Sequence, residues 1–160
     1  MLLKYIGLVM LAAAGGVVSR EYEKNQRKRL AEFSEFIRLS EHIKTKISCF
    51  LSPKSDWLSD FSSDNAAVSE FLVYAKSFPL SESFASVKDK LSLCDEAKIL
   101  ERLFSSLGKN YKEGEIELLD GACRELNGER QRLSSECEKN VKTVKGLSAA
   151  ISLGLIILLV

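Results

Sequence analysis

The sequence predicts an all-α protein, a bundle of about six helices whose first and last helices are extended by terminal transmembrane segments. Three observations support this prediction. Apolar residues recur in steps of three and four through most of the chain. Residues 20–51 contain neither glycine nor proline. No run alternates apolar and polar residues with the period of two that a half-buried strand requires.

The two chain ends are predicted to be transmembrane helices, at residues 1–19 and 146–160. Their uncharged runs, Tyr5–Val18 and Leu147–Val160, each have 14 residues. Such a run covers about 21 Å as a helix, whereas a bilayer core is about 30 Å thick. The prediction therefore requires flanking lysines to extend their long side chains to the interface and lengthen each span.

Basic residues gather on the chain-interior side of both terminal segments. They are Arg20, Lys24, Arg27, Lys28, Arg29, Lys139, Lys142 and Lys145, whereas only Lys4 lies on the other side. Because lysine and arginine near a span favour the cytoplasmic face, we expect residues 20–145 to form a cytoplasmic helical bundle. The expected location is the cell membrane.

A second interpretation of the N-terminus stays open at this point. Lys4 followed by an apolar run and the small residues Ala12–Gly16 is also typical of a cleaved signal peptide. The chain would then be an exported helical protein with a C-terminal membrane anchor. That alternative predicts that Arg20–Lys145 lie outside the cell, where the cysteines are able to oxidise.

The first helix of the bundle is predicted over residues 20–51. Its apolar face comprises Leu30, Phe33, Phe36, Ile37, Leu39, Ile43, Ile47 and Phe50. Ser52-Pro53 should end it and begin a second helix, with Ser52 as the N-cap and Pro53 at the first helical position. This second helix would carry Trp57, Leu58 and Phe61, which we select as the candidate partner-binding residues.

Four more helices follow along the chain. The third begins after the polar residues 62–65, the fourth opens at Ser81 after Pro79, and the fifth begins near Cys94 and ends at Gly108. Their inward-facing residues would be Val68, Phe71, Leu72 and Ala75, then Phe84, Val87 and Leu91, then Ile99, Leu100, Leu103, Phe104 and Leu107. The last helix begins after residues 110–113 and continues into the terminal segment, with Ile116, Leu119, Cys123, Leu126, Leu133, Cys137, Val141 and Val144 along its apolar side.

Charge and motifs exclude several classes of function. With 23 basic and 22 acidic residues the net charge is +1, which argues against nucleic-acid binding because a binder needs an excess of basic residues. Phosphate-loop, dinucleotide-binding, zinc-protease and nucleophile-elbow motifs are absent. The single histidine, His42, and four dispersed cysteines do not form a zinc pattern. We therefore expect no catalytic, cofactor-binding or metal-binding residues and no enzymatic activity. A membrane-bound enzyme would need a polar pocket that the sequence does not indicate. The four cysteines are expected to be reduced and mostly buried.

The order of these features resembles the stage III sporulation protein AB family of endospore-forming bacteria, over the whole chain. The residues that carry the resemblance are the apolar N-terminal helix with its arginine flank, Ser52-Pro53, Pro79-Leu80, Leu107-Gly108, Glu138-Lys139-Asn140-Val141-Lys142, Leu147 and Leu155-Ile156-Ile157-Leu158-Leu159. Each motif is loose, and their order and spacing make the match. Where the family tends to have Thr-Pro-Leu, this chain has Ser52-Pro53-Lys54.

The resemblance implies a function that composition alone does not indicate. Family members have a six-helix cytoplasmic domain similar to the platform protein of type II secretion and type IV pilus systems. They belong to a channel between mother cell and forespore, in which the platform is thought to engage a secretion-type ATPase. The resemblance thus implies a non-enzymatic scaffold in the mother-cell membrane whose partners are that ATPase and other channel subunits. From the terminal segments we also expect contact with membrane lipid, and a homo-oligomer of the chain stays open.

Overall fold

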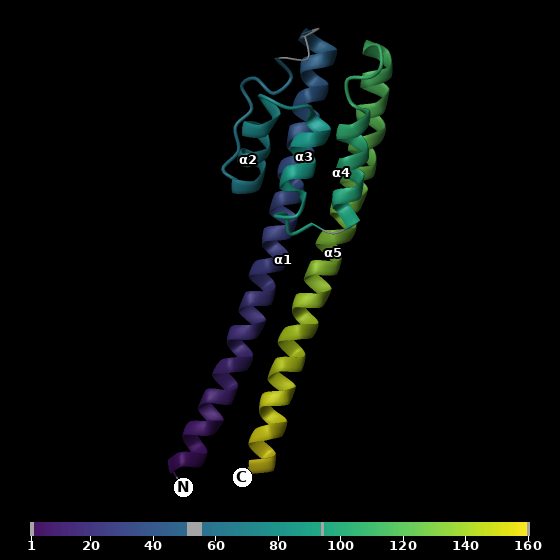
Figure 1. The fold of residues 1–160 in the computed structure, drawn as a ribbon. Coiled ribbons are helices and arrows are strands. Elements are labelled where there is room, and N and C mark those ends of the chain that lie inside the picture. Colours follow the sequence, from purple (N-terminus) through teal and green to yellow (C-terminus); the bar gives the residue numbers. More distant parts are fainter. Residues whose placement is uncertain (1, 51–55, 94, 160) are drawn as a thin grey trace. The chain divides into compact units, whose positions relative to one another are not determined.

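The computed structural model describes residues 2–50, 56–93 and 95–159, with side chains from residue 16 on except residues 50, 155, 156, 158 and 159. Within these described ranges, five α-helices follow one another along the chain (Figure 1). They are α1 (Leu2–Phe50), α2 (Ala66–Ala75), α3 (Leu80–Lys88), α4 (Asp95–Ser106) and α5 (Lys112–Leu159). These described ranges contain no strand. The all-α prediction is confirmed.

The chain divides into two compact units. The central unit is Arg29–Arg132, and the end unit consists of Met1–Lys28 together with Leu133–Val160. Each of the two long helices contributes to both units, because α1 and α5 continue past the boundaries at residues 28 and 132.

Phe36 of α1 occupies the middle of the central unit and has no exposed surface. Its ring meets those of Phe71, Phe84 and Phe104 edge to face, with centroid separations of 5.8, 5.6 and 6.2 Å. These rings come from α2, α3 and α4, so this one residue of α1 contacts all three short helices. Figure 1 shows these helices beside the α1 and α5 portions of the unit.

Residues next to the short helices determine where α2 begins and where α4 ends. Asn65 caps α2 by accepting hydrogen bonds from the backbone amides of Ala67 and Val68, at 3.0 and 3.3 Å. After α4, Gly108 adopts a φ of 85°, a conformation that glycine reaches without the steric cost other residues incur. Glu115 of α5 then accepts from the amides of Gly108 and Asn110 at 3.0 and 2.7 Å, which ties this turn to α5.

The described residues contain five helices, whereas about six were predicted. Ser52 and Pro53, the expected start of the second helix, lie outside the described residues, and residues 56–61 form turns rather than an α-helix. The turns are closed by Ser59 N–H donating to the Asp56 carbonyl at 3.0 Å, and Asp60 has a φ of 62°, which a helix does not allow.

Contacts with α1 explain why this segment is not helical. Three polar side chains of α1 donate hydrogen bonds to this segment and the residue after it. Arg38 donates to the Ser62 carbonyl at 2.7 Å, and His42 Nε2 donates to the Ser59 carbonyl at 3.0 Å. Lys46 donates to the Asp60 carboxylate at 2.9 Å. Backbone groups that bond to another element are not available for helical hydrogen bonds. Tertiary contacts therefore override the local helix signal.

The predicted transmembrane segments at 1–19 and 146–160 are not supported. Helices α1 and α5 do include residues 2–19 and 146–159, as expected. In the part of the chain that the structure describes, however, none of the helices combines the length and the apolar character needed to cross a membrane.

The end unit pairs the beginning of α1 with the end of α5. Glu23 and Lys145 form an ion pair at 2.6 Å, and this hydrogen bond is the largest cause that lowers the pKa of the Glu23 carboxyl. Ser19, Leu133 and Cys137 are buried. Large apolar side chains nevertheless remain exposed on this unit, namely Val17, Val18, Leu147, Ile151, Leu153 and Ile157.

Candidate functional site

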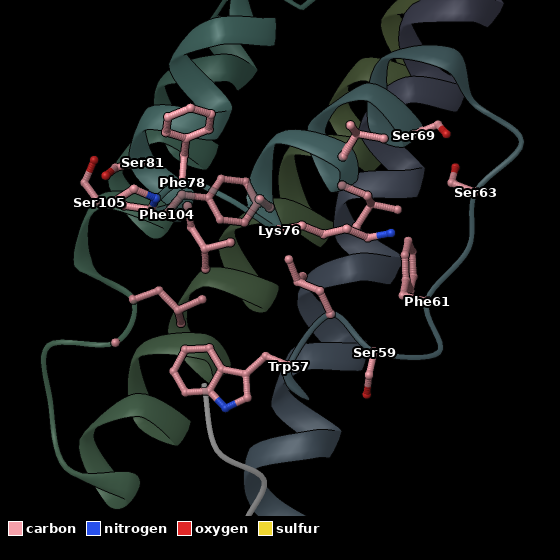
Figure 2. A pocket seen from close by; sticks show the side chains of 18 of the residues that line it. Trp57, Ser59, Phe61, Ser63, Ser69, Lys76, Phe78, Ser81, Phe104 and Ser105 are labelled. Carbon is pink, nitrogen blue, oxygen red and sulfur yellow. The ribbon is translucent and has the colours of Figure 1, made fainter. Parts of the chain in front are cut away.

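A cleft of about 810 Å³ lies beside α2 in the central unit (Figure 2). Its walls come from the turn segment 57–63, α2, the link to α3, and the end of α4 with the residues that follow. The lining residues are Trp57, Leu58, Ser59, Phe61, Ser62, Ser63, Ser69, Leu72, Val73, Ala75, Lys76, Phe78, Pro79, Leu80, Ser81, Phe104, Ser105, Leu107, Gly108 and Lys109. Its size falls within the range of about 300–1,000 Å³ typical of ligand pockets.

Trp57, Leu58 and Phe61, the partner-binding residues predicted from the sequence, all line this cleft. Trp57 is only 6% exposed, whereas Leu58 and Phe61 are half-buried. The turn that replaces the expected helix brings the three together. On its other side the Phe61 ring contacts Arg38, whose Cζ lies 4.9 Å from the ring centroid. Their role in partner binding stays a prediction.

Helix α2 supplies much of the cleft. The sequence analysis did not identify this helix as part of a binding surface. Eight of its ten residues are apolar or aromatic, with Ser69 and Glu70 as the exceptions. A helix that is apolar all round is normally buried on every side. Here only Val68 and Phe71 are buried, while Val73 at the cleft is 63% exposed. The nearly uninterrupted apolar sequence of α2 was the signal that could have identified this surface.

Phe78, between α2 and α3, is a second exposed apolar residue of the cleft, at 53%. Figure 2 shows it with Phe104 and Trp57 among the lining side chains. Contiguous exposed apolar surface is uncommon on a protein that has no partner for it. The cleft therefore has the composition of a binding surface.

The charges around the cleft are of one sign. Lys76 and Lys109 line it, and the described lining residues include no aspartate or glutamate. Two neighbouring acidic residues are paired with other lysines: Asp60 with Lys46, and Glu70 with Lys90. The hydrogen bond from Lys46 lowers the pKa of the Asp60 carboxyl, and the bond to Glu70 raises the pKa of Lys90.

The lysines of the cleft are not paired in this way. The ammonium groups of Lys76 and Lys109 are exposed and make no ion pair within the residues described. Two positive charges without an ion-pair partner among the described residues thus lie beside the apolar side chains of the cleft. This arrangement favours an anionic group attached to an apolar one.

The chemistry of the lining is that of a binding site. Six serine hydroxyls accompany the two lysines, and the described lining has no carboxylate, imidazole or thiol. In the described ranges 2–50, 56–93 and 95–159, no three histidine, cysteine or acidic side chains come together as a metal site would require. What this arrangement can do is hold an apolar group by packing and orient it with hydrogen bonds and charge.

His42, Cys49, Cys123 and Cys137 are not among the described lining residues, although His42 donates to the carbonyl of the lining residue Ser59. His42 belongs to a smaller hollow of about 420 Å³ with Arg38 and Asp60. Cys49 is exposed, whereas Cys123 and Cys137 are buried and all three are unbridged. Burial raises the pKa of the Cys123 thiol. Cys94 lies outside the described residues.

Comparison with protein families gives one match. The family model of stage III sporulation protein AB aligns with residues 4–160. The aligned segment contains the cleft, the three short helices, α5 and all of α1 except its first two residues. No curated protein and no solved structure matched the chain in the corresponding comparisons.

Proposed function

The chain belongs to the stage III sporulation protein AB family, and from this premise we propose that it is a non-enzymatic platform subunit of a secretion-like channel between mother cell and forespore. In this role it couples a cytoplasmic secretion-type ATPase to the membrane complex. The observation that carries the proposal is the family match over residues 4–160. The family resemblance implies the platform role.

The structure supports a scaffold in two respects. The central unit offers an open apolar cleft that contains Trp57, Leu58 and Phe61, and its chemistry suits binding. The end unit exposes apolar side chains from both α1 and α5. A subunit that connects two partners needs two distinct contact surfaces, and these two lie in different units.

We assign the end unit to the membrane and the central unit to the cytoplasm. The exposed side chains Val17, Leu147 and Ile151 would cost less free energy against lipid than in water. A flotation assay with the full-length chain and liposomes tests this assignment. Co-flotation that Leu147→Asp together with Ile151→Asp abolishes is expected, while recovery of the parent chain in the unbound fraction contradicts it.

The exposed thiol of Cys49 tests the cytoplasmic location of the central unit. A membrane-impermeant maleimide is applied to intact cells that express the Cys94→Ser variant, and then to permeabilised cells. Labelling only after permeabilisation is expected. Labelling of intact cells would instead favour the alternative, an exported helical protein with a signal peptide and a C-terminal anchor.

Direct binding tests the coupling to the ATPase. The purified full-length chain should bind the purified secretion-type ATPase of the same sporulation complex, and Val73→Asp in the cleft should weaken the complex. Val73 is 63% exposed, so this variant should fold normally. Tyr111→Asp is the matched control because Tyr111 is exposed and does not line the cleft. Absence of any complex with the parent chain contradicts ATPase coupling.

A further inference from the structure

We propose that the cleft beside α2 binds an acidic amphipathic helix of a partner protein, whose apolar side chains pack on α2 and whose carboxylates pair with Lys76 and Lys109. This inference deepens the proposed scaffold role and rests on it for the existence of a partner. The contact segment of that partner is expected to be apolar on one face and acidic beside it.

The apolar part of the argument rests on α2. Its residues Val68 and Phe71 face the core, while Leu72 and Val73 line the cleft together with Ser69. The exposed Phe78 extends this surface toward α3. An amphipathic helix in a groove buries surface of this kind through side chains spaced three and four residues apart.

The charged part of the argument rests on the two lysines. They are the only charged residues of the described lining. The carboxylates nearest in sequence to the lining serines Ser59 and Ser69 are Asp60 and Glu70, and each is already in an ion pair with another lysine. Asp64 and Glu82 also neighbour lining serines in sequence, but neither lines the cleft. A partner segment that carries carboxylates beside its apolar residues would therefore complement the positive charge of the cleft.

The serines indicate a polypeptide rather than a purely apolar ligand. Of the lining serines, Ser59 and Ser63 already donate to the Asp56 carbonyl and to Glu35. Ser69, Ser81 and Ser105 lie at α2, α3 and α4 (Figure 2). Hydroxyl groups both donate and accept hydrogen bonds. They are suited to the polar side chains and the terminal backbone groups that a helix presents next to its apolar face.

Trp57 provides the measurement, because it is the single tryptophan of the chain and lines the cleft. The full-length protein is titrated with a helical peptide about four turns long. This peptide carries leucine along one face and glutamate on both flanks of that face. A matched peptide has lysine in place of every glutamate. Saturable change in Trp57 emission reports occupancy, and the glutamate peptide should bind at least about tenfold more tightly than the lysine peptide.

Charge reversal in the protein makes the test specific. The Lys76→Glu/Lys109→Glu variant should lose about tenfold in affinity for the glutamate peptide and gain affinity for the lysine peptide. Lys139→Glu is the control, because Lys139 is exposed, lies in the end unit and should leave both affinities unchanged. Far-ultraviolet circular dichroism checks that the double variant keeps its helical content.

Several outcomes would overturn the proposal. They are no saturable change with the glutamate peptide, equal binding of both peptides, and charge reversal that leaves the preference unaltered. A Trp57 signal that changes on dilution of the protein alone would identify a second copy of the chain as the occupant, and this too would overturn it. Peptide binding without ATPase binding would retain the cleft assignment and remove the proposed coupling, so the two failures are distinguishable.

Discussion

Arg29 of α1 donates a hydrogen bond to Glu96 of α4 across 2.6 Å, and the two residues are 67 positions apart in the chain. The Glu96 side chain is only 1% exposed, while that of Arg29 is 25% exposed. A buried carboxylate is tolerated when a cation and hydrogen bonds replace its hydration. This pair thus specifies how the start of α4 is placed against α1 in the central unit.

Replacement of Arg29 should destabilise the central unit. Arg29→Met keeps much of the side-chain length but removes the cation, so Glu96 stays buried without it. The expected loss is about 3 kcal/mol in the free energy of unfolding, measured by urea denaturation. Arg102→Met is the control, because the Arg102–Glu125 pair at 2.8 Å is exposed and should contribute much less. Equal losses for the two variants would contradict the structural role of the Arg29–Glu96 pair.

Truncation of Phe36 should have the largest effect in the core. Phe36→Ala removes the ring that contacts Phe71, Phe84 and Phe104 and leaves a cavity. The expected destabilisation is about 3–5 kcal/mol, measured by urea denaturation followed by circular dichroism. Tyr111→Ala should change stability little because Tyr111 is 92% exposed. A small effect at Phe36 would mean that the aromatic cluster is not the centre of the core.

The Lys46–Asp60 pair should make the turn segment sensitive to acid. The lysine lowers the pKa of Asp60 in the folded state, so the carboxylate stabilises that state above its ordinary pKa of about 3.9. This contribution is lost as the pH falls through the lower pKa of the folded state. Asp60→Asn, which still tolerates the positive φ of residue 60, should be less stable than the parent chain at pH 7. The difference should shrink below about pH 4; a difference that is constant with pH contradicts this contribution.

The cysteines should differ sharply in reactivity. Cys49 is exposed, whereas Cys123 and Cys137 are buried, and burial raises the pKa of the Cys123 thiol. Because the thiolate is the reactive form, a maleimide at pH 7 should modify Cys49 well before the other two in the Cys94→Ser background. Mass spectrometry of the intact protein over time shows the order. In urea all three should react at similar rates, and similar rates in the native protein would contradict the burial of Cys123 and Cys137.

The sequence by itself determined the all-α class and five of the helices, because each is specified by neighbouring residues. The three- and four-residue spacing of Phe33, Phe36 and Ile43 is sufficient to predict the buried face of α1, and all three are buried. Gly108 likewise predicts where α4 ends. These signals act within a few residues, so they do not depend on the rest of the fold.

Only the tertiary structure decided the turn at residues 56–61 and the cleft beside it. Local signals favoured a helix after Pro53, but bonds from Arg38, His42 and Lys46 to this segment come from residues at least 14 positions away and favour turns. Trp57, Leu58 and Phe61, selected from the sequence, line the cleft, but the sequence did not indicate that Lys76 and Lys109 would border the same surface. Which residues share a cleft depends on how helices pack, and packing is set by contacts distant in sequence.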